Sequence, residues 1–213
     1  MKSKYRHIFF DVDSTLVTIE GIDVLARGNP EIVRLTEAAM NGEIPVEDVY
    51  GRRLEIIRPS RTDIDALAEQ YLASMVDGVE ETIATLQAGG ASVHLVTGGI
   101  AQAVAPLARR LHVRHVHAVA LQFHEDGSYA DFDRRSLLAR SGGKELVVRA
   151  VLARAKGSSA FIGDGVTDLE TKPVVDLFIG FGGVHERARV RENASVYVSD
   201  PTLKAVLPYL IES

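Results

Sequence analysis

The sequence predicts a doubly wound α/β fold of the Rossmann-like type, with a mainly parallel sheet, an inserted helical cap and a small β-hairpin insertion. Three observations lead to this fold class. Short apolar runs rich in β-formers alternate with helical patterns, as in βαβ units. Residues 18–75 show helical patterns and no convincing strand. Asp126-Gly127 lies between alternating residues, which is a strong hairpin signal within 121–132.

The core is expected to comprise residues 1–17 and 76–213, with the cap at 18–75. Within the cap, an apolar stripe at helical spacing is expected to be core, and it consists of Ile64, Leu67, Tyr71, Leu72 and Met75. The predicted strands are 5–10, 91–96, 159–162, 177–179 and 195–198, and the predicted core helices are 79–87, 100–111 and 144–155. Each strand ends in polar or glycine-rich sequence. Because ligands of open parallel sheets bind at the carboxyl ends of the strands, chemistry is expected there.

Composition limits the classes of partner. The chain has 213 residues, 46% of them hydrophobic and 25% charged, which suffices for one large domain with an insertion. A formal charge of −5 provides no basic field for nucleic acid or an anionic membrane, so a small solute is the expected partner. We expect a monomer or homodimer.

The absence of cysteine excludes disulfides, thiolate metal sites and a cysteine nucleophile, and it fits a reducing compartment. The first apolar run, Ile8-Phe9-Phe10, stops at Asp11, which is too short for a signal segment or a membrane span. A cytoplasmic enzyme is therefore expected.

Two carboxylates, Asp11 and Asp13, directly follow the first apolar strand. The turn at a strand end can aim one carboxylate at a substrate while the other acts on the same bond. A hard cation would offset their repulsion. A bare Asp-x-Asp is also compatible with a solvated loop, so this motif depends on the others.

Thr97, Gly98 and Gly99 end the second core strand, immediately before a helical pattern. Glycines permit close backbone approach, a helix N-terminus offers free N–H groups, and the Thr97 hydroxyl adds a donor, so the segment is typical of a phosphate cradle. A plain strand-to-helix turn gives the same pattern.

Lys144 opens a predicted helix, where a cation is locally unfavourable and an anion should compensate it. Asp164 and Asp168 follow a further apolar strand, four residues apart, with the hydroxyl of Thr167 between them. Oxygen ligands in this number suit Mg²⁺, whereas no histidine or cysteine pattern here suits zinc.

These motifs together resemble the haloacid dehalogenase superfamily, whose pattern is matched in order by Asp11, Asp13, Thr15, Thr97, Lys144, Asp164 and Asp168. The resemblance implies a Mg²⁺-dependent phosphatase that works through an aspartyl-phosphate. Asp11 would be the nucleophile and Asp13 the acid and base, while Thr97 and Lys144 bind the phosphoryl group. The metal would be held by Asp11, the Asp13 carbonyl and Asp164, with Asp168 orienting this shell.

Cap segments around Glu20, Thr36 to Gly42 and Arg53 further resemble the phosphoserine phosphatase family. This implies that Glu20 holds a substrate ammonium and Arg53 a carboxylate. The remaining substrate contacts it implies are Met40, Gly42, Gly98, Gly99 and Thr167. Arg53 also shares a helical stripe with Val46, Val49, Tyr50 and Ile57, where an unused charge would be costly. The chain departs from the family pattern at Val46, Asp77 and Val184, which bears on substrate identity.

O-phospho-L-serine is therefore the leading substrate. Another small phosphorylated metabolite, such as phosphothreonine, phosphohomoserine or a sugar phosphate, is the near alternative. A non-hydrolytic phospho-acceptor module is a third, which Asp13 opposes because storing phosphate needs no acid. His115 and His117 are interpreted as half-exposed strand residues rather than metal ligands, and the arginines of 187–191 as a solvated helix face.

Overall fold

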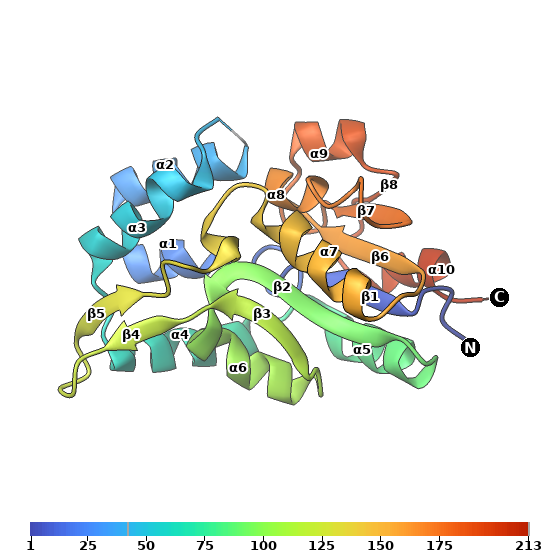
Figure 1. Ribbon diagram of the computed structural model, residues 1–213, viewed down its shortest axis with the longest axis horizontal. Helices are drawn as coiled ribbons and strands as arrows, with labels where there is room; N and C mark the ends of the chain where they lie inside the picture. Colours follow the sequence, from blue (N-terminus) through green and yellow to red (C-terminus); the bar gives the residue numbers. More distant parts are fainter. Residues whose placement is uncertain (42, 213) are drawn as a thin grey trace.

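The fold is built on a six-stranded sheet in which every neighbouring pair of strands is parallel. The computed structural model describes residues 1–41 and 43–212. The strand order is β3-β2-β1-β6-β7-β8, and Figure 1 shows helices on both sides of this sheet. The strands are β1 (His7–Phe10), β2 (Ser92–Ile100), β3 (His115–Val119), β6 (Ser159–Gly163), β7 (Leu177–Phe181) and β8 (Val196–Val198). The predicted doubly wound fold class is thus confirmed.

The path of β2 corrects one expectation. The strand continues through Thr97, Gly98 and Gly99 to Ile100, and helix α6 (Ala101–Arg110) begins only after it. The two glycines therefore lie in extended backbone, with an irregular register between Val96 and Ile100, and not at a helix N-terminus. Close backbone approach remains available there, but the free N–H groups of a helix start do not.

Two helical layers cover the sheet. Helices α5 (Val79–Ala88) and α6 lie on one face, and α7 (Gly143–Arg154) lies on the other (Figure 1). The short helices α8 (Val166–Leu169), α9 (Ala188–Asn193), η2 (Leu203–Val206) and α10 (Leu207–Leu210) complete the part around β6 to β8. Within the described residues, no helix is both long enough and apolar enough to cross a bilayer.

Four helices lie where the cap was expected: α1 (Gly21–Ala26), α2 (Pro30–Met40), α3 (Val46–Ile57) and α4 (Arg61–Ala73). The two ends of this segment are tied together, because Val17 forms an antiparallel bridge with Met75. Helix α4 starts with a capping box, in which Ser60 and Asp63 exchange hydrogen bonds with each other's backbone N–H.

The hairpin consists of β4 (Leu121–Phe123) and β5 (Tyr129–Phe132) and forms a separate two-stranded sheet. Its Phe132 ring packs against Tyr50 of α3, with ring centroids 5.3 Å apart. The chain then forms the short helix η1 (Leu137–Ala139) and enters α7. The hairpin and η1 thus connect the cap to the helix that carries Lys144.

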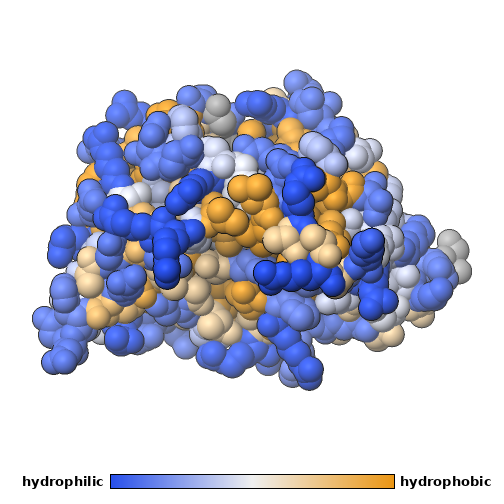
Figure 2. All heavy atoms as spheres, viewed as in Figure 1, coloured by the Kyte–Doolittle hydropathy of each residue, from blue (hydrophilic) through white to orange (hydrophobic). Residues whose placement is uncertain are grey.

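A groove of about 650 Å³ lies between α7 and the adjoining face of β1, β2 and β3. The strands contribute His7, His94, His115 and His117 to its lining. Apolar side chains gather at the surface in the middle of this view (Figure 2), and Leu137 and Leu146 are 38% and 47% exposed. The sequence placed His115 and His117 on a strand but did not indicate that His7 and His94 join them.

Burial of these imidazoles predicts that acid weakens the fold. Burial lowers the pKa of His94 to about 3, and neighbouring histidines add to the effect, whereas the unfolded chain titrates near 6.5. Between about pH 3 and pH 6.5 the unfolded state therefore binds more protons at His94 than the folded state does. The free energy of unfolding is highest above pH 6.5 and decreases as the pH falls below this value. His94 alone should lower the free energy of unfolding by about 2 kcal/mol between pH 7.5 and pH 5.

Urea unfolding with chelator present, at both pH values, measures this loss. His94→Gln cannot titrate and should show a smaller pH dependence, while His124→Gln, on the exposed hairpin turn, should behave like the wild type. Equal pH dependence in His94→Gln and wild type would contradict the prediction.

Candidate active site

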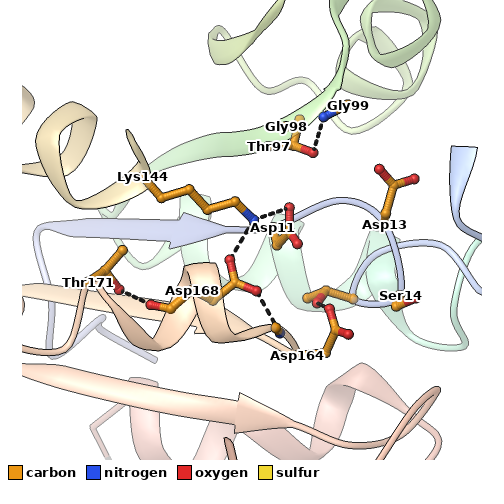
Figure 3. Close-up of polar contacts among 12 residues, drawn as sticks. Asp11, Asp13, Ser14, Thr97, Gly98, Gly99, Lys144, Asp164, Asp168 and Thr171 are labelled. Atoms are coloured by element: carbon orange, nitrogen blue, oxygen red, sulfur yellow. Dashed lines mark hydrogen bonds and ion pairs between the residues drawn. The ribbon is translucent and has the colours of Figure 1, made fainter. Parts of the chain in front are cut away.

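Charged side chains converge where the central strands end, as Figure 3 shows. Asp11 directly follows β1, and Asp164 directly follows β6. Asp168 comes from α8 and Lys144 from the first turn of α7. Since parallel strands end at the same edge of a sheet, motifs distant in sequence meet here. All four side chains are buried.

Lys144 lies between two carboxylates. Its Nζ is 2.9 Å from Asp11 Oδ1 and donates a hydrogen bond to Asp168 Oδ1 at 2.6 Å. Burial alone would lower the pKa of Lys144, but the negative charges of Asp11 and Asp168 outweigh it and raise this pKa. The anion expected beside this lysine is thus supplied within the protein, and the ammonium stays charged and available to a phosphoryl group.

Asp168 is held rigidly. Its Oδ2 accepts a hydrogen bond from the Gly165 N–H at 2.9 Å, while its carbonyl accepts one from the Thr171 hydroxyl at 2.6 Å. A Cβ at Gly163 would lie 2.3 Å from the Asp168 carboxyl carbon, so only glycine fits there. Burial, and then the charge of Asp11, raises the pKa of Asp168 well above its usual range.

Carboxylate oxygens of Asp11, Asp164 and Asp168 lie within 4.8 Å of one another, the one cluster of this kind in the described part of the chain. Burial, and then repulsion from Glu20, raises the pKa of Asp164 to about 7. A divalent cation would relieve this repulsion, and the all-oxygen donor set suits a hard one. The carboxylate cluster includes Asp168, expected only to orient the shell. It does not include the Asp13 carboxylate, and ligation by the Asp13 carbonyl stays a prediction.

Asp13 is held from the cap. Its Oδ1 accepts hydrogen bonds from the Tyr71 hydroxyl at 2.7 Å and from the Gly21 N–H at 3.0 Å. Burial raises the pKa of Asp13 to about 7, although the hydrogen bond from Tyr71 opposes the shift. A carboxyl group with this pKa can both give and take a proton near neutral pH.

Tyr71 was expected to be core only, and this was incomplete. Its ring is fully buried in the core cluster, but its hydroxyl reaches Asp13. A buried tyrosine hydroxyl usually finds a partner, and this was the signal in the sequence that could have indicated a second role.

Thr97 and the two glycines face Asp13. The Thr97 hydroxyl accepts a hydrogen bond from the Gly99 N–H at 2.9 Å (Figure 3), which leaves its own proton free to donate. A Cβ at Gly99 would be 3.1 Å from Asp13 Oδ2, so this backbone lies close to the carboxyl group. The Gly98 carbonyl accepts a hydrogen bond from the Tyr50 hydroxyl at 2.8 Å, which ties β2 to the cap.

A half-buried carboxyl group and a buried guanidinium lie at the cap end. Glu20 accepts a hydrogen bond from the Ser14 hydroxyl at 2.6 Å, and burial raises its pKa to about 8. Arg53 is 7% exposed, and its Nη1 donates to the Thr36 hydroxyl at 3.1 Å. Its Nε has no hydrogen-bond partner among the described residues. Burial lowers the pKa of Arg53, which indicates that this cation lacks full compensation.

Arg187 does not lie on a solvated helix face, which corrects the expectation for this member of the 187–191 run. Its side chain is 13% exposed, its Nε donates to Asp164 Oδ2 at 3.0 Å, and its Nη2 lies 3.7 Å from Glu20. Arg189 and Arg191 are exposed as expected. Sequence periodicity could not separate them, because Arg187 precedes the short helix α9.

A cavity of about 90 Å³ joins the two ends of the site. Its lining includes most of the predicted site residues, namely Asp11, Asp13, Glu20, Arg53, Thr97, Gly98, Gly99, Lys144 and Thr167, and also Val46. Asp164 and Asp168 are not in this lining, although Asp168 contacts Lys144 and both lie close to Asp11. Met40 is the last residue of α2, and Gly42 lies outside the described residues.

Comparison with known proteins agrees with this architecture. The family model for haloacid dehalogenase-like hydrolases matches residues 8–171. Phosphoserine phosphatase of Mus musculus is 37% identical over 199 residues, which cover 91% of this chain and 88% of that protein. The Homo sapiens phosphoserine phosphatase matches with the same identity and coverage.

Two solved structures share the fold over nearly the whole chain. A phosphoserine phosphohydrolase-like protein from Francisella tularensis superposes with a TM-score of 0.87 and 25% identity, covering 99% of this chain and 100% of that one. A structure of a phospho-aspartyl intermediate analogue of phosphoserine phosphatase superposes with a TM-score of 0.82 and 25% sequence identity. This match covers 98% of this chain and 100% of that chain. The chain therefore belongs to the haloacid dehalogenase-like hydrolases and, within them, to the phosphoserine phosphatase family.

Proposed function

We propose that this protein hydrolyses O-phospho-L-serine to L-serine and phosphate through an aspartyl-phosphate on Asp11. The observation that carries the substrate assignment is the pair of groups of opposite type that line the cap end of the cavity, the half-buried carboxyl group of Glu20 and the buried guanidinium of Arg53. Burying the Arg53 guanidinium, whose Nε has no hydrogen-bond partner among the described residues, is costly without an anion beside it. A zwitterionic amino-acid end would satisfy both at once, and its phosphate would reach Asp11 and Lys144. Relatives named phosphoserine phosphatase, at 37% identity, support the assignment.

In the first step, the Asp11 carboxylate attacks phosphorus in line with the serine oxygen. The phosphorus–oxygen bond to serine breaks, and Asp13 gives its proton to the departing alkoxide. The pKa of Asp13, raised to about 7 by burial, keeps a protonated fraction available near neutral pH. Tyr71 and Gly21 fix the direction of this carboxyl group.

In the second step, the now ionised Asp13 takes a proton from a water molecule that attacks the same phosphorus. The bond between phosphorus and Asp11 breaks, which releases phosphate and restores both carboxyl groups. Lys144 and the free proton of the Thr97 hydroxyl bind the equatorial phosphoryl oxygens, where negative charge gathers in the transition state.

We assign Mg²⁺ to the oxygen cluster of Asp11 and Asp164, with Asp168 beside it. When bound, the cation neutralises charge on the phosphoryl group and on the carboxylates. Arg187 lies 3.0 Å from Asp164 and supplies part of the positive charge around this cluster from the protein itself.

A substitution at Arg53 tests the substrate assignment. A bidentate guanidinium–carboxylate pair cannot be reproduced by lysine, and hydrogen bonds to charged groups contribute about 1.5–3 kcal/mol. Arg53→Lys should therefore lower kcat/KM for phosphoserine about 10- to 100-fold. It should change kcat/KM for an aryl phosphate without a carboxylate far less.

Phosphate release from a panel of phosphoserine, phosphothreonine, phosphohomoserine, a sugar phosphate and the aryl phosphate measures this selectivity. Arg52→Lys is the matched control, because Arg52 is exposed and pairs with Glu31 on the surface. Asp11→Asn should abolish turnover of every substrate. Equal losses for phosphoserine and aryl phosphate in Arg53→Lys would make Arg53 structural and leave the phosphatase assignment intact.

Removing the Tyr71 hydroxyl tests how Asp13 is oriented. Tyr71→Phe keeps the buried ring but removes one hydrogen bond to the carboxyl group, so kcat should fall about tenfold or more with little change in KM. Tyr129→Phe is the control, since the buried Tyr129 hydroxyl has no hydrogen-bond partner among the described residues. Steady-state kinetics with unchanged kcat in Tyr71→Phe would remove Tyr71 from this role.

Magnesium should stabilise the fold, because it relieves repulsion within the carboxylate cluster. Linkage predicts about 2.7 kcal/mol at a hundredfold excess over the dissociation constant. Thermal melting in chelator and in millimolar Mg²⁺ measures the shift. Asp164→Asn should reduce it strongly, whereas Asp65→Asn, at an exposed position of α4, should not. A wild-type melting temperature that is the same in chelator and in Mg²⁺ would argue against a cation at the carboxylate cluster.

A further inference from the structure

The Thr36 hydroxyl lines the cap end of the cavity, and the proposed reaction gives it no task. Thr36 lies on α2 and is 3% exposed. Its Oγ1 donates a hydrogen bond to the Ile32 carbonyl, one helical turn earlier, at 3.0 Å, and accepts one from Arg53 Nη1 at 3.1 Å. The bond to Ile32 fixes the direction of the hydroxyl proton, so the oxygen presents a lone pair to the guanidinium.

The Arg53 guanidinium has few contacts that could fix its angle. The bond to Thr36 is the one hydrogen bond that it makes within residues 1–41 and 43–212. Its Cζ lies over the Tyr50 ring, 5.7 Å from the centroid. Attraction to the face of a ring holds a cation in place but lets a planar group turn about its own axis. The directional contact that restricts this turning is therefore the one with Thr36.

Charge holds Arg53 in the cap without orienting it. Asp23, on α1, is half-buried and does not line the cavity. Among the carboxylates, Asp23 acts most strongly to raise the pKa of Arg53, although burial outweighs it and lowers this pKa. Burial raises the pKa of Asp23, while the nearby Thr36 hydroxyl and the charge of Arg53 oppose that shift. Attraction between charges depends on distance and leaves the plane of the guanidinium undefined.

Resting on the proposed function, we propose that Thr36 is a positioning residue, which turns the Arg53 guanidinium toward the carboxylate of the substrate. A bidentate guanidinium–carboxylate pair forms only when the two planar groups are aligned. A guanidinium that is aligned before the substrate arrives does not lose this freedom on binding, which favours association. Thr36 thus contributes to the selection of substrates that carry a carboxylate, and it does not act on the phosphoryl end.

Thr36→Val tests this role, because valine keeps the branched shape and removes the hydroxyl. We expect kcat/KM for phosphoserine to fall about tenfold, mainly through a higher KM. The value for the aryl phosphate without a carboxylate should not change. Thr36→Ser keeps a hydroxyl and should restore most of the activity toward phosphoserine. Thr82→Val is the matched control, since the Thr82 hydroxyl on α5 is buried and has no hydrogen-bond partner among the described residues.

A double variant shows whether Thr36 acts through Arg53. Two residues that serve one interaction do not lose it twice, so Thr36→Val should cause no further loss of phosphoserine activity in the Arg53→Lys background. Thermal melting checks that each variant folds, and Thr36→Ala replaces Thr36→Val if the latter does not fold.

The outcomes separate this role from the proposed function. If the wild type releases no phosphate from phosphoserine, the proposed function fails, and the role of Thr36 fails with it. If the wild type prefers phosphoserine and Thr36→Val prefers it equally, only the role of Thr36 is overturned. Equal losses for both substrates, equal losses in Thr36→Ser and Thr36→Val, or a full further loss in the Arg53→Lys background would also overturn it.

Discussion

The buried ammonium of Lys144 is the interaction on which the rest of the active site depends. Three carboxylates are buried together, two directly after the neighbouring strands β1 and β6 and one in α8, and their desolvation and mutual repulsion would be severe without a positive charge among them. Lys144 contacts two of them, Asp11 and Asp168, within 2.9 Å. Its position is fixed by the start of α7, where a Cβ on Gly143 would lie 1.9 Å from the Leu137 carbonyl oxygen. The path of the backbone before α7 therefore places the Lys144 ammonium where it can compensate the charges of Asp11 and Asp168.

The cap completes this core site in two ways. It supplies Glu20 and Arg53, the charges suited to an amino-acid end, and it supplies Tyr71, whose hydroxyl holds Asp13. Tyr50 makes a further tie by donating to the Gly98 carbonyl. In the proposed reaction, substrate recognition and the orientation of the acid–base group would thus depend on the same small set of cap helices. In physical terms, binding energy at the remote end of a substrate can be used to align the reacting end.

The sheet separates two kinds of chemistry. Its carboxyl edge gathers oxygen ligands and an ammonium, whereas one face of its first three strands gathers neutral imidazoles. Both arise from simple geometry: strand ends converge in a parallel sheet, and alternate residues of neighbouring strands share a face. Helix α7 lies over that face, and the groove runs between this helix and the strands.

The sequence by itself determined the fold class and located the four candidate motifs in their order, because each motif is local and lies next to an apolar strand or at the start of a helix. It also predicted that Lys144 needs an anion and that Arg53 lies on a buried stripe. Periodicity could not reveal the second role of Tyr71, the turn of Arg187 toward Asp164, or the extended path of Gly98 and Gly99. Nor could it gather His7 and His94 with His115 and His117. These features depend on contacts between segments far apart in the chain, and only strand order, register and the placement of the cap decide such contacts.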